Sequence, residues 1–262
     1  MPGTTVTSGA AWPTTGFFGK LPSRGDFIGR HLPKSFLEPW DAWLQAAIVQ
    51  SRSQLGESWR ECYCTSPIWR FTLGAGVCGP TACAGILMPS VDRVGRYYPL
   101  ALIAPLALNE PLLTLPTTGA AWFQQAERLA LDALDRDELD LDDFSQQVAT
   151  LDAPPAVGFA ATSAVTGNTW CCSLPESSDE SPISPILANH LLRKAFPQPS
   201  LWWTEGSEQI TRCLLICDGM PPVAGFVALL TGNWQHWGWN ELSLVGIADL
   251  PGESATAEED QA

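Results

Sequence analysis

The segment WRFTLGAGVCGPTACAGILMPSVDRVGRYYPLALI, residues 69–103, carries the pattern that decides the fold of this chain. Apolar runs at Trp69–Val77, Thr81–Met88 and Tyr97–Ile103 predict three β-strands. The turn residues 78–80 and the loop 89–96 separate them. Such short links allow only antiparallel neighbours, because a parallel pair needs a crossover of about a dozen residues or more. We therefore expect an antiparallel meander here.

A long helix is predicted before this meander, over Ser35–Leu55. Its apolar residues recur at helical spacing, which is typical of a helix with one buried face. Ser35 is the expected N-cap, with Glu38 three residues later as in a capping box. Gly56 is expected to end the helix.

The second half of the chain is predicted to combine helices with a second strand-rich region. Helices are expected at Gly119–Leu134, Asp142–Leu151 and Ser184–Ala195. Strands are expected at Ala156–Thr162, Thr169–Ser173, Leu201–Thr204, Arg212–Cys217 and Gly225–Leu229, with a surface loop at Ser177–Pro182. Together these elements predict an α/β fold of the α+β type, with a mainly antiparallel sheet and flanking helices on both sides.

Residues 16–251 are expected to form one α/β domain, alternatively with a smaller C-terminal half at about 156–251. Residues 1–15 are predicted to be a flexible leader and 252–262 a disordered acidic tail, because neither holds enough apolar surface to become ordered. The chain shows no signal-peptide pattern at its start and no apolar run long enough to cross a bilayer. This favours a cytoplasmic protein without membrane insertion.

The formal net charge of −14 limits the classes of macromolecule that the protein is expected to bind. It disfavours binding to nucleic acid or to an anionic membrane surface. The acids gather at residues 132–143, 176–180 and 253–260, and the first of these groups is expected to be a solvated helix face. Residues 1–100 instead hold nine Lys/Arg against six Asp/Glu, which leaves room for a local basic patch.

The eight cysteines do not form a recognisable metal motif, since no pair has C-x-x-C spacing. Cys213 and Cys217 have a possible ligand separation, but they fall on a predicted buried strand. Residues four apart on a strand are roughly 13 Å from each other, too far to bind one ion together. We expect reduced, mostly buried thiols, no metal site and no cofactor.

Enzyme motifs are absent from the sequence. There is no nucleophile elbow, zinc-protease motif or phosphate-binding loop, and Gly16–Leu21 resembles the last only superficially. His31, His190 and His236 are dispersed along the chain. The sequence thus predicts a non-enzymatic protein with no catalytic residues.

Two polar clusters, Gly16–Phe27 and Pro89–Pro99, each combine glycines with one carboxylate and basic side chains. In one interpretation, Asp26 and Asp92 hold their own loops through backbone N–H groups or nearby arginines. In the other, the two loops form one recognition surface that offers arginines to a carboxylate or phosphate of a partner. We name this candidate the two-loop surface, and its residues are Lys20, Ser23, Arg24, Asp26, Phe27, Asp92, Arg93 and Arg96.

Two alternatives remain open. Gly232–Trp239 is a second candidate surface, unless its tryptophans simply cover the edge of the core. The alternative function is a hydrolase or phosphatase-like enzyme that uses Asp26 or Asp92 with a neighbouring Arg. An enzyme predicts that these carboxylates converge in a deep pocket, whereas a binding protein predicts a shallow exposed patch.

The same two clusters resemble the signature of the TagF family, also called ImpM. The resemblance lies in Gly16–Ile28, continued by Trp40–Leu44, and in Ala84–Leu100. Leu201–Thr204 and Gly219–Pro222 agree with the C-terminal half of that family, so that the likeness spans roughly residues 16–231.

This resemblance implies a cytoplasmic accessory protein of the bacterial type VI secretion system. It implies a post-translational repressor that binds the forkhead-associated scaffold protein Fha. Some relatives are fused to a PppA-type phosphatase, and here any such phosphatase is expected on a separate polypeptide. The family signature transfers no partner-binding residue, so the two-loop surface is a physical prediction only.

Overall fold

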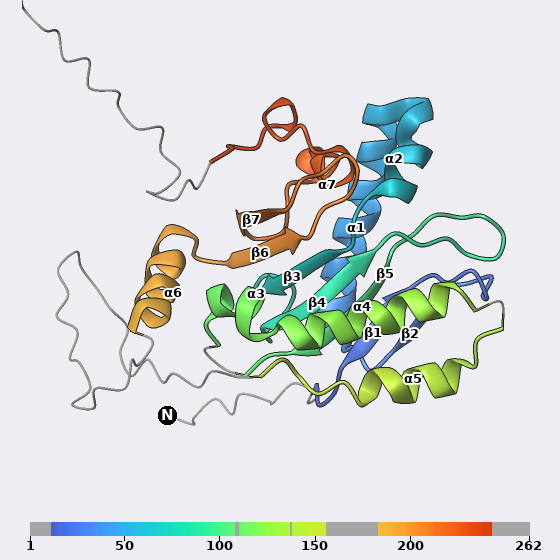
Figure 1. Cartoon of the computed structure of the whole chain (residues 1–262), viewed down its shortest axis with the longest axis horizontal. Helices are drawn as coiled ribbons and strands as arrows, with labels where there is room; N and C mark the ends of the chain where they lie inside the picture. The colour runs from blue at the N-terminus through green and yellow to red at the C-terminus, as the bar shows by residue number, and fades with distance from the viewer. Residues whose placement is uncertain (1–11, 108–109, 137, 156–182, 243–262) are drawn as a thin grey trace, which may run out of the picture.

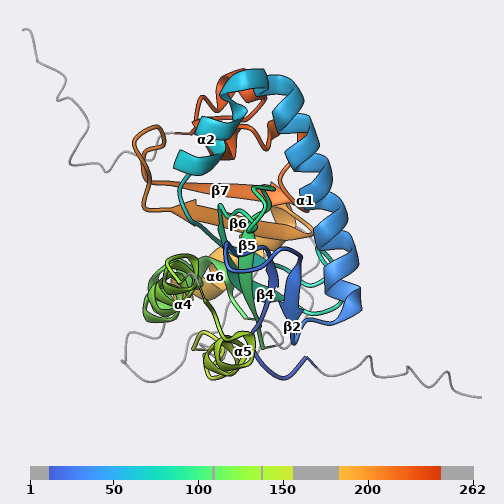
Figure 2. The ribbon, with the colours of Figure 1, turned by 90° about the vertical axis from the view of Figure 1, so that its right-hand side faces the viewer.

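The computed structural model describes residues 12–107, 110–136, 138–155 and 183–242 (Figure 1). Seven strands form one sheet in the order β2-β1-β5-β4-β3-β6-β7. All neighbouring strands in this sheet are antiparallel. Figure 2 shows α1 against one face of the sheet and α4 and α5 against the other. The predicted α+β fold with helices on both sides is confirmed.

The strands of this sheet are β1 (Gly16–Gly19), β2 (Ile28–Arg30), β3 (Trp69–Leu73), β4 (Cys83–Met88), β5 (Leu100–Pro105), β6 (Pro199–Thr204) and β7 (Cys213–Asp218). The predicted meander is confirmed as β3-β4-β5, although β3 is shorter than expected and β5 begins later. The sequence missed β1 and β2, because strands of four and three residues are too short to display an alternating pattern. Residues 16–19 are therefore part of the sheet, and only Lys20–Phe27 form a loop.

The helices are α1 (Lys34–Leu55), α2 (Trp59–Thr65), α3 (Leu115–Thr118), α4 (Ala120–Leu134), α5 (Leu141–Ala149), α6 (Ile183–Ala195) and α7 (Ala228–Thr231). Short 3-10 turns lie at Gly56–Ser58, Leu112–Thr114, Val223–Gly225 and Gln235–Trp237. Within the described residues, no helix is long and apolar enough to cross a membrane.

Several local predictions were wrong. The N-cap of α1 is Pro33 rather than Ser35, and no side chain caps this end, so the capping box does not form. Gly225–Leu229 is helical instead of extended, because a short apolar run does not distinguish a buried strand from a buried helical turn. The sequence also missed α2, which is only seven residues long.

The strand predicted at Arg212–Cys217 is not fully buried. It corresponds to β7, which lies at the edge of the sheet. Leu214 and Ile216 are exposed on one face, while Leu215 and Cys217 are buried on the other. All cysteines in the described part of the chain are free thiols, and no metal-binding group of His, Cys, Asp and Glu occurs there.

The predicted leader is anchored at its C-terminal end. Trp12 packs against Phe36, with ring centroids 5.1 Å apart, and the Thr15 hydroxyl donates to the Leu151 carbonyl over 2.6 Å. Other predictions lie outside the described residues, namely the strands Ala156–Thr162 and Thr169–Ser173, the loop Ser177–Pro182 and the tail 252–262.

An aromatic stack joins α1 to the centre of the sheet. The buried Trp40 ring lies 5.0 Å from Phe71 on β3 and 5.4 Å from Phe36, measured between centroids. Phe71 in turn stacks on Trp202 of β6 at 4.8 Å. Trp203, the next residue, contacts Phe123 of α4 on the opposite face, because successive strand residues point to opposite sides.

We predict that Trp40→Ala lowers the free energy of unfolding by about 3–5 kcal/mol, since it leaves a cavity between α1 and the sheet. Urea unfolding followed by circular dichroism measures this effect. Val49→Ala on the same helix is the matched control, because Val49 is 69% exposed and its truncation should cost less than about 0.5 kcal/mol. Equal losses in both variants would contradict the central role of the stack.

Candidate functional site

The pairing of β1 with β5 brings the two polar clusters together. The first loop, Lys20–Phe27, leaves β1 where the second loop, Pro89–Pro99, leads into β5. The backbone N–H of Arg93 donates to the Arg24 carbonyl over 2.8 Å. Gly19 lets the end of β1 lie close against the start of β5, because its φ is +149° and a Cβ would lie 2.2 Å from the Pro99 carbonyl oxygen.

The Asp92 carboxylate is the centre of this junction. Its side chain is completely buried, and Oδ2 accepts from Lys20 Nζ at 2.8 Å and from Arg96 Nε at 2.7 Å. Oδ1 accepts from the backbone N–H groups of Val94 at 3.0 Å and Arg96 at 2.9 Å. The two loops are thus joined by charge-assisted hydrogen bonds to one carboxylate.

These contacts determine the charge state of Asp92. Burial by itself would raise the pKa of this carboxyl, because it penalises the charged form. The hydrogen bonds from Lys20, from the backbone and side chain of Arg96 and from the backbone of Val94 stabilise the charged form more strongly, so the pKa lies below its ordinary value. Asp92 is therefore a carboxylate at neutral pH.

A second set of bonds fixes the loops beneath Asp92. The Ser90 hydroxyl donates to the Lys20 carbonyl over 2.6 Å. The Tyr63 hydroxyl, from α2, donates to the Ser90 carbonyl at 2.9 Å and accepts from the Ser90 N–H at 3.0 Å. Burial raises the pKa of Tyr63 well above its usual range, so the hydroxyl keeps the proton that it donates.

Phe27 presents an aromatic ring beside the buried ions. It is 43% exposed, stacks on Phe18 at 5.5 Å and meets the edge of Tyr98 at 4.8 Å, measured between ring centroids. Lys20 Nζ lies 4.8 Å from the centre of the ring, within cation–π distance. The ring is therefore held in one orientation although almost half of it faces solvent.

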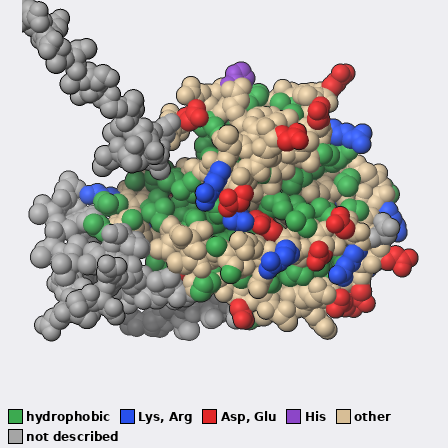
Figure 3. Space-filling model, viewed as in Figure 1, with side chains coloured by type: hydrophobic (Ala, Val, Ile, Leu, Met, Phe, Trp, Pro, Cys, Tyr) green, Lys and Arg blue, Asp and Glu red, His purple; other side chains and the backbone are tan. Residues whose placement is uncertain are grey.

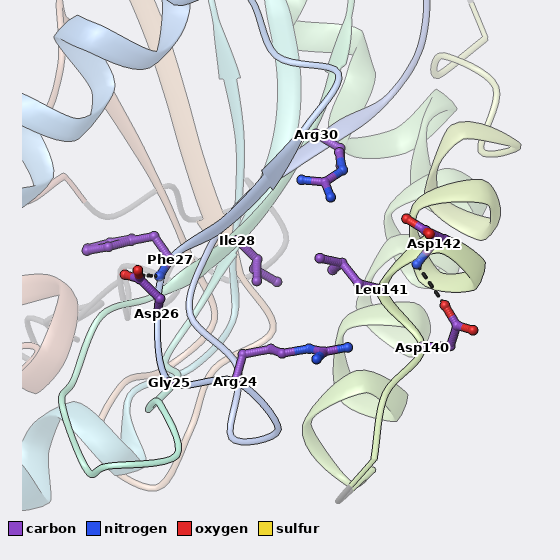
Figure 4. A pocket seen from close by; sticks show the side chains of 9 residues that line it. All are labelled: Arg24, Gly25, Asp26, Phe27, Ile28, Arg30, Asp140, Leu141 and Asp142. Carbon is purple, nitrogen blue, oxygen red and sulfur yellow. Dashed lines mark hydrogen bonds between the residues drawn. The ribbon is translucent and has the colours of Figure 1, made fainter.

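An open groove of about 460 Å³ separates the first loop from α5 (Figure 4). Arg24, Ile28 and Arg30 line it on the side of the loop, and Asp140 and Asp142 line it on the side of α5. Figure 4 shows that the Phe27 ring points away from this groove. Arg24 crosses it, where Nη2 donates to the Leu139 carbonyl over 2.6 Å.

Asp140 and Asp26 serve as local backbone acceptors in this region. Asp140 caps α5 by accepting from the backbone N–H groups of Asp142 and Asp143. Asp26 accepts from the N–H of Phe27 at 2.8 Å. The described acidic residues at positions 132–143 are exposed, whereas Glu127 of α4 is half-buried and pairs with the buried Arg70.

The structure places the eight residues of the two-loop surface at different depths. Lys20 and Asp92 are buried, Ser23 and Arg24 are half-buried, and the other four are exposed. Asp92 holds the loops as the first interpretation predicted, and within the described part of the chain Asp26 bonds to the adjacent backbone N–H of Phe27. The arrangement also leaves Phe27, Arg93 and Arg96 accessible on one side of the molecule.

Sequence reasoning missed a second groove, of about 500 Å³, lined by Arg52, Trp59, Gly95, Arg96 and Tyr97. Arg96 borders this groove and also belongs to the two-loop surface. The available signal was the alternation of arginines and aromatics in the segment 52–63, but these residues come together with Tyr97 only through tertiary contacts.

The other candidates from the sequence do not join this site. Trp234 packs edge-on against Trp69 at 6.1 Å, and Trp239 donates its indole N–H to the Gly225 carbonyl, so both cover the edge of the core. His31 Nε2 lies 3.1 Å from the buried Ser145 hydroxyl, and neither residue lines the two grooves.

Comparison with known proteins assigns a class to this fold and site. Residues 16–151, more than half of the chain, match the model of the TagF N-terminal domain, described as type VI secretion system-associated. The chain is thus a protein associated with that secretion system. In particular, it belongs to the TagF family, as its two polar clusters indicated.

A solved structure supports the fold. The chain is similar to the crystal structure of PA0076 from Pseudomonas aeruginosa PAO1, with 38% sequence identity and a TM-score of 0.72. The similarity covers 89% of this chain and 100% of that one. Comparison with curated proteins finds no match.

We predict that Asp92→Asn lowers the free energy of unfolding at neutral pH by about 3–5 kcal/mol, because it leaves the buried Lys20 without a compensating charge. The difference in the free energy of unfolding between this variant and the unsubstituted protein should become smaller as the pH is lowered. A carboxyl whose folded-state pKa is depressed stabilises the fold above its unfolded-state pKa, near 3.9. That contribution is lost as the pH falls toward the lower folded-state pKa.

Urea unfolding at several pH values between neutral and about 3 measures this dependence, with 3.9 as the reference pKa of the unfolded carboxyl. Asp26→Asn is the matched control, since the exposed Asp26 bonds to the adjacent backbone N–H of Phe27. If Asp92→Asn lowers the free energy of unfolding by the same amount at acidic and at neutral pH, the charge of Asp92 does not hold the loops.

Proposed function

We propose that the chain is a non-enzymatic, cytoplasmic accessory protein of type VI secretion that represses secretion after translation by binding the forkhead-associated scaffold Fha. A PppA-type phosphatase acts in the same pathway. The mechanism is stoichiometric: the folded protein occupies a surface of the scaffold and locks or sequesters it. This requires a rigid recognition surface and no chemical step.

The exposed part of the two-loop surface carries this proposal. Phe27 is 43% exposed, and Val94, which lies beside Arg93 but was not among the predicted residues, is 66% exposed. Both lie on loops that the buried Asp92–Lys20 pair holds in place. Arg93 and Arg96 are exposed on the same second loop. A few rigid aromatic and arginine side chains supply most of the affinity of a typical protein interface.

The geometry does not favour the enzymatic alternative. Asp92 is enclosed and fully hydrogen-bonded, and its lowered pKa makes it a weak base. Asp26 borders the open groove beside α5, and Asp92 does not line that groove. A hydrolase would need a reactive carboxylate that faces a substrate pocket.

We predict that the double variant Arg93→Glu/Val94→Asp binds purified Fha at least about tenfold more weakly, a loss of about 1.4 kcal/mol or more. Both positions are exposed at the tip of the second loop, so the substitutions place new negative charge on the interface without disturbing the ion cluster. Isothermal titration calorimetry measures the affinity, and circular dichroism checks the fold.

The matched control is Arg128→Glu, an exposed arginine on α4, which lies across the sheet from α1 and lines neither groove. Its affinity for Fha should equal that of the unsubstituted protein. If the loop variant binds as tightly as the control, the two-loop surface is not the interface. If the unsubstituted protein itself does not bind Fha, the proposed partner is wrong.

A further inference from the structure

The groove between the end of α1, α2 and the second loop concentrates arginines against aromatic rings. Arg52 comes from α1, Trp59 from α2, and Arg96 and Tyr97 from the loop before β5. Arg60 lies beside Tyr97, with its guanidinium carbon 5.9 Å from the ring centre. Two guanidinium groups thus line one open groove, and a third lies beside the Tyr97 ring of its lining.

The guanidinium of Arg52 is held in position before any ligand binds. Its central carbon lies 4.2 Å from the centre of the Trp59 ring, within cation–π distance. A guanidinium over a ring face keeps its N–H groups directed outward in its own plane. Among the described residues, Arg52 and Arg60 form no salt bridge, so these donors remain available.

The aromatic platform is itself rigid. Trp59 is only 4% exposed, and its indole N–H donates to the Ser51 hydroxyl over 2.9 Å. It stacks on Tyr63 at 4.8 Å and meets the edge of Tyr97 at 5.6 Å. Because packing against the core already fixes these rings, binding of a ligand would cost little conformational entropy in the side chains of the groove.

The local charge is positive although the whole chain is negative. Lys20 and Arg96 carry two positive charges against the one negative charge of Asp92, which leaves a net charge of +1. Arg52 and Arg60 add two more positive charges. The exposed acids Glu57 and Glu61 lie on the same stretch of chain, and although they make no salt bridge with these arginines they reduce the local excess from three positive charges to one. This excess of charge is complementary to an anionic ligand.

The distribution of the arginines distinguishes between anionic ligands. Arg52 and Arg60, which arise from α1 and α2, can each engage a separate negative charge. Arg96 donates through Nε to Asp92 and through Nη2 to the Gly25 carbonyl, so in the described structure it offers mainly its Nη1 to a ligand. A stretch of glutamate and aspartate side chains presents such charges along an extended backbone, whereas one phosphate presents them at a single point. Paired guanidinium–carboxylate contacts are also geometrically specific.

We propose that this groove docks an acidic segment of a partner protein, with its carboxylates held by Arg52, Arg60 and Arg96. The proposal rests on the proposed function and extends it, because Arg96 connects the groove to the two-loop surface. It assigns a chemistry to the partner, namely clustered carboxylates, and it adds Arg52 and Arg60 to the interface.

The face that carries α4 offers a suitable control, since no residue of α4 lines the groove. Figure 3 shows acidic and basic side chains intermingled on the face that carries α4, without a field of one sign. Arg128 on α4 is exposed like Arg52 and Arg60 and makes no salt bridge in the described part of the chain. Reversal of its charge changes the net charge of the protein but leaves the groove intact.

The test uses the full chain and a fluorescein-labelled peptide rich in glutamate, with a second peptide in which every glutamate is replaced by glutamine. Fluorescence anisotropy should detect binding of the glutamate peptide that weakens with added salt. Arg52→Glu and Arg60→Glu should each reduce its affinity at least about fivefold, and the double variant more than about tenfold, whereas Arg128→Glu should have the small effect of an exposed distant charge. Circular dichroism confirms that the variants are folded.

Equal binding by the double variant and by Arg128→Glu, or equal binding of the glutamine peptide, would overturn the proposal. Binding of a single-phosphothreonine peptide but not of the glutamate peptide would also overturn it.

Titration of Fha with the same variants separates the two proposals. If Fha binding depends on Arg93 and Val94 but not on Arg52 and Arg60, the proposed function stands and the acidic-segment groove does not. If the glutamate peptide binds through the groove and Fha does not bind, the groove stands and its partner is another protein.

Discussion

The burial of the Asp92 carboxylate is the constraint around which this end of the molecule is arranged. A buried charge without partners would be strongly destabilising, so the fold must bring cationic and N–H donors to it. Lys20 supplies one donor from the strand-linked first loop, and Arg96 and Val94 supply the others from the second loop. The bonds to this carboxylate therefore join the two loops, and the bonds of Ser90 and the rings packed against Phe27 complete their support.

The sheet makes this arrangement possible. The meander β3-β4-β5 carries the second loop between its last two strands, and the pairing of β1 with β5 places the first loop beside it. The stack of Trp40, Phe71 and Trp202 fastens α1 to the sheet, and the Tyr63 hydroxyl fastens α2 to Ser90 at the base of the second loop. Loops with such support are rigid, which is the property that a stoichiometric binding surface needs.

The ion cluster of Lys20, Asp92 and Arg96 and the exposed side chains around it lie within residues 16–151, the part of the chain that matches the TagF family model. The buried ion pair of Lys20 and Asp92 holds the two loops together. The side chains that the loops expose to solvent include those of Phe27, Arg93, Val94 and Arg96. The groove beside Arg96 extends that surface toward α1 and α2, so that an apolar contact and a cationic contact lie next to each other. A partner with both an apolar patch and acidic side chains would fit this combination.

The sequence by itself determined the elements with a clear pattern and the motifs that identify the family. The long apolar spacing of α1, the meander between residues 69 and 103 and the helices α4 and α5 were predictable because periodic burial leaves a direct trace in the order of residues. The eight residues of the two-loop surface were proposed because glycines, arginines and a carboxylate gather in two short segments. The role of Asp92 remained open between two interpretations, because spacing does not reveal whether a carboxylate is buried.

Only the tertiary structure decided how these segments meet. β1 and β2 are too short to show a period, and the helical turn at α7 has the same apolar run as a buried strand. Lys20 and Asp92 are 72 positions apart, and Arg52 meets Arg96 across a groove built by three segments. Such contacts depend on strand pairing and core packing between distant residues, and no local pattern in a single sequence records them.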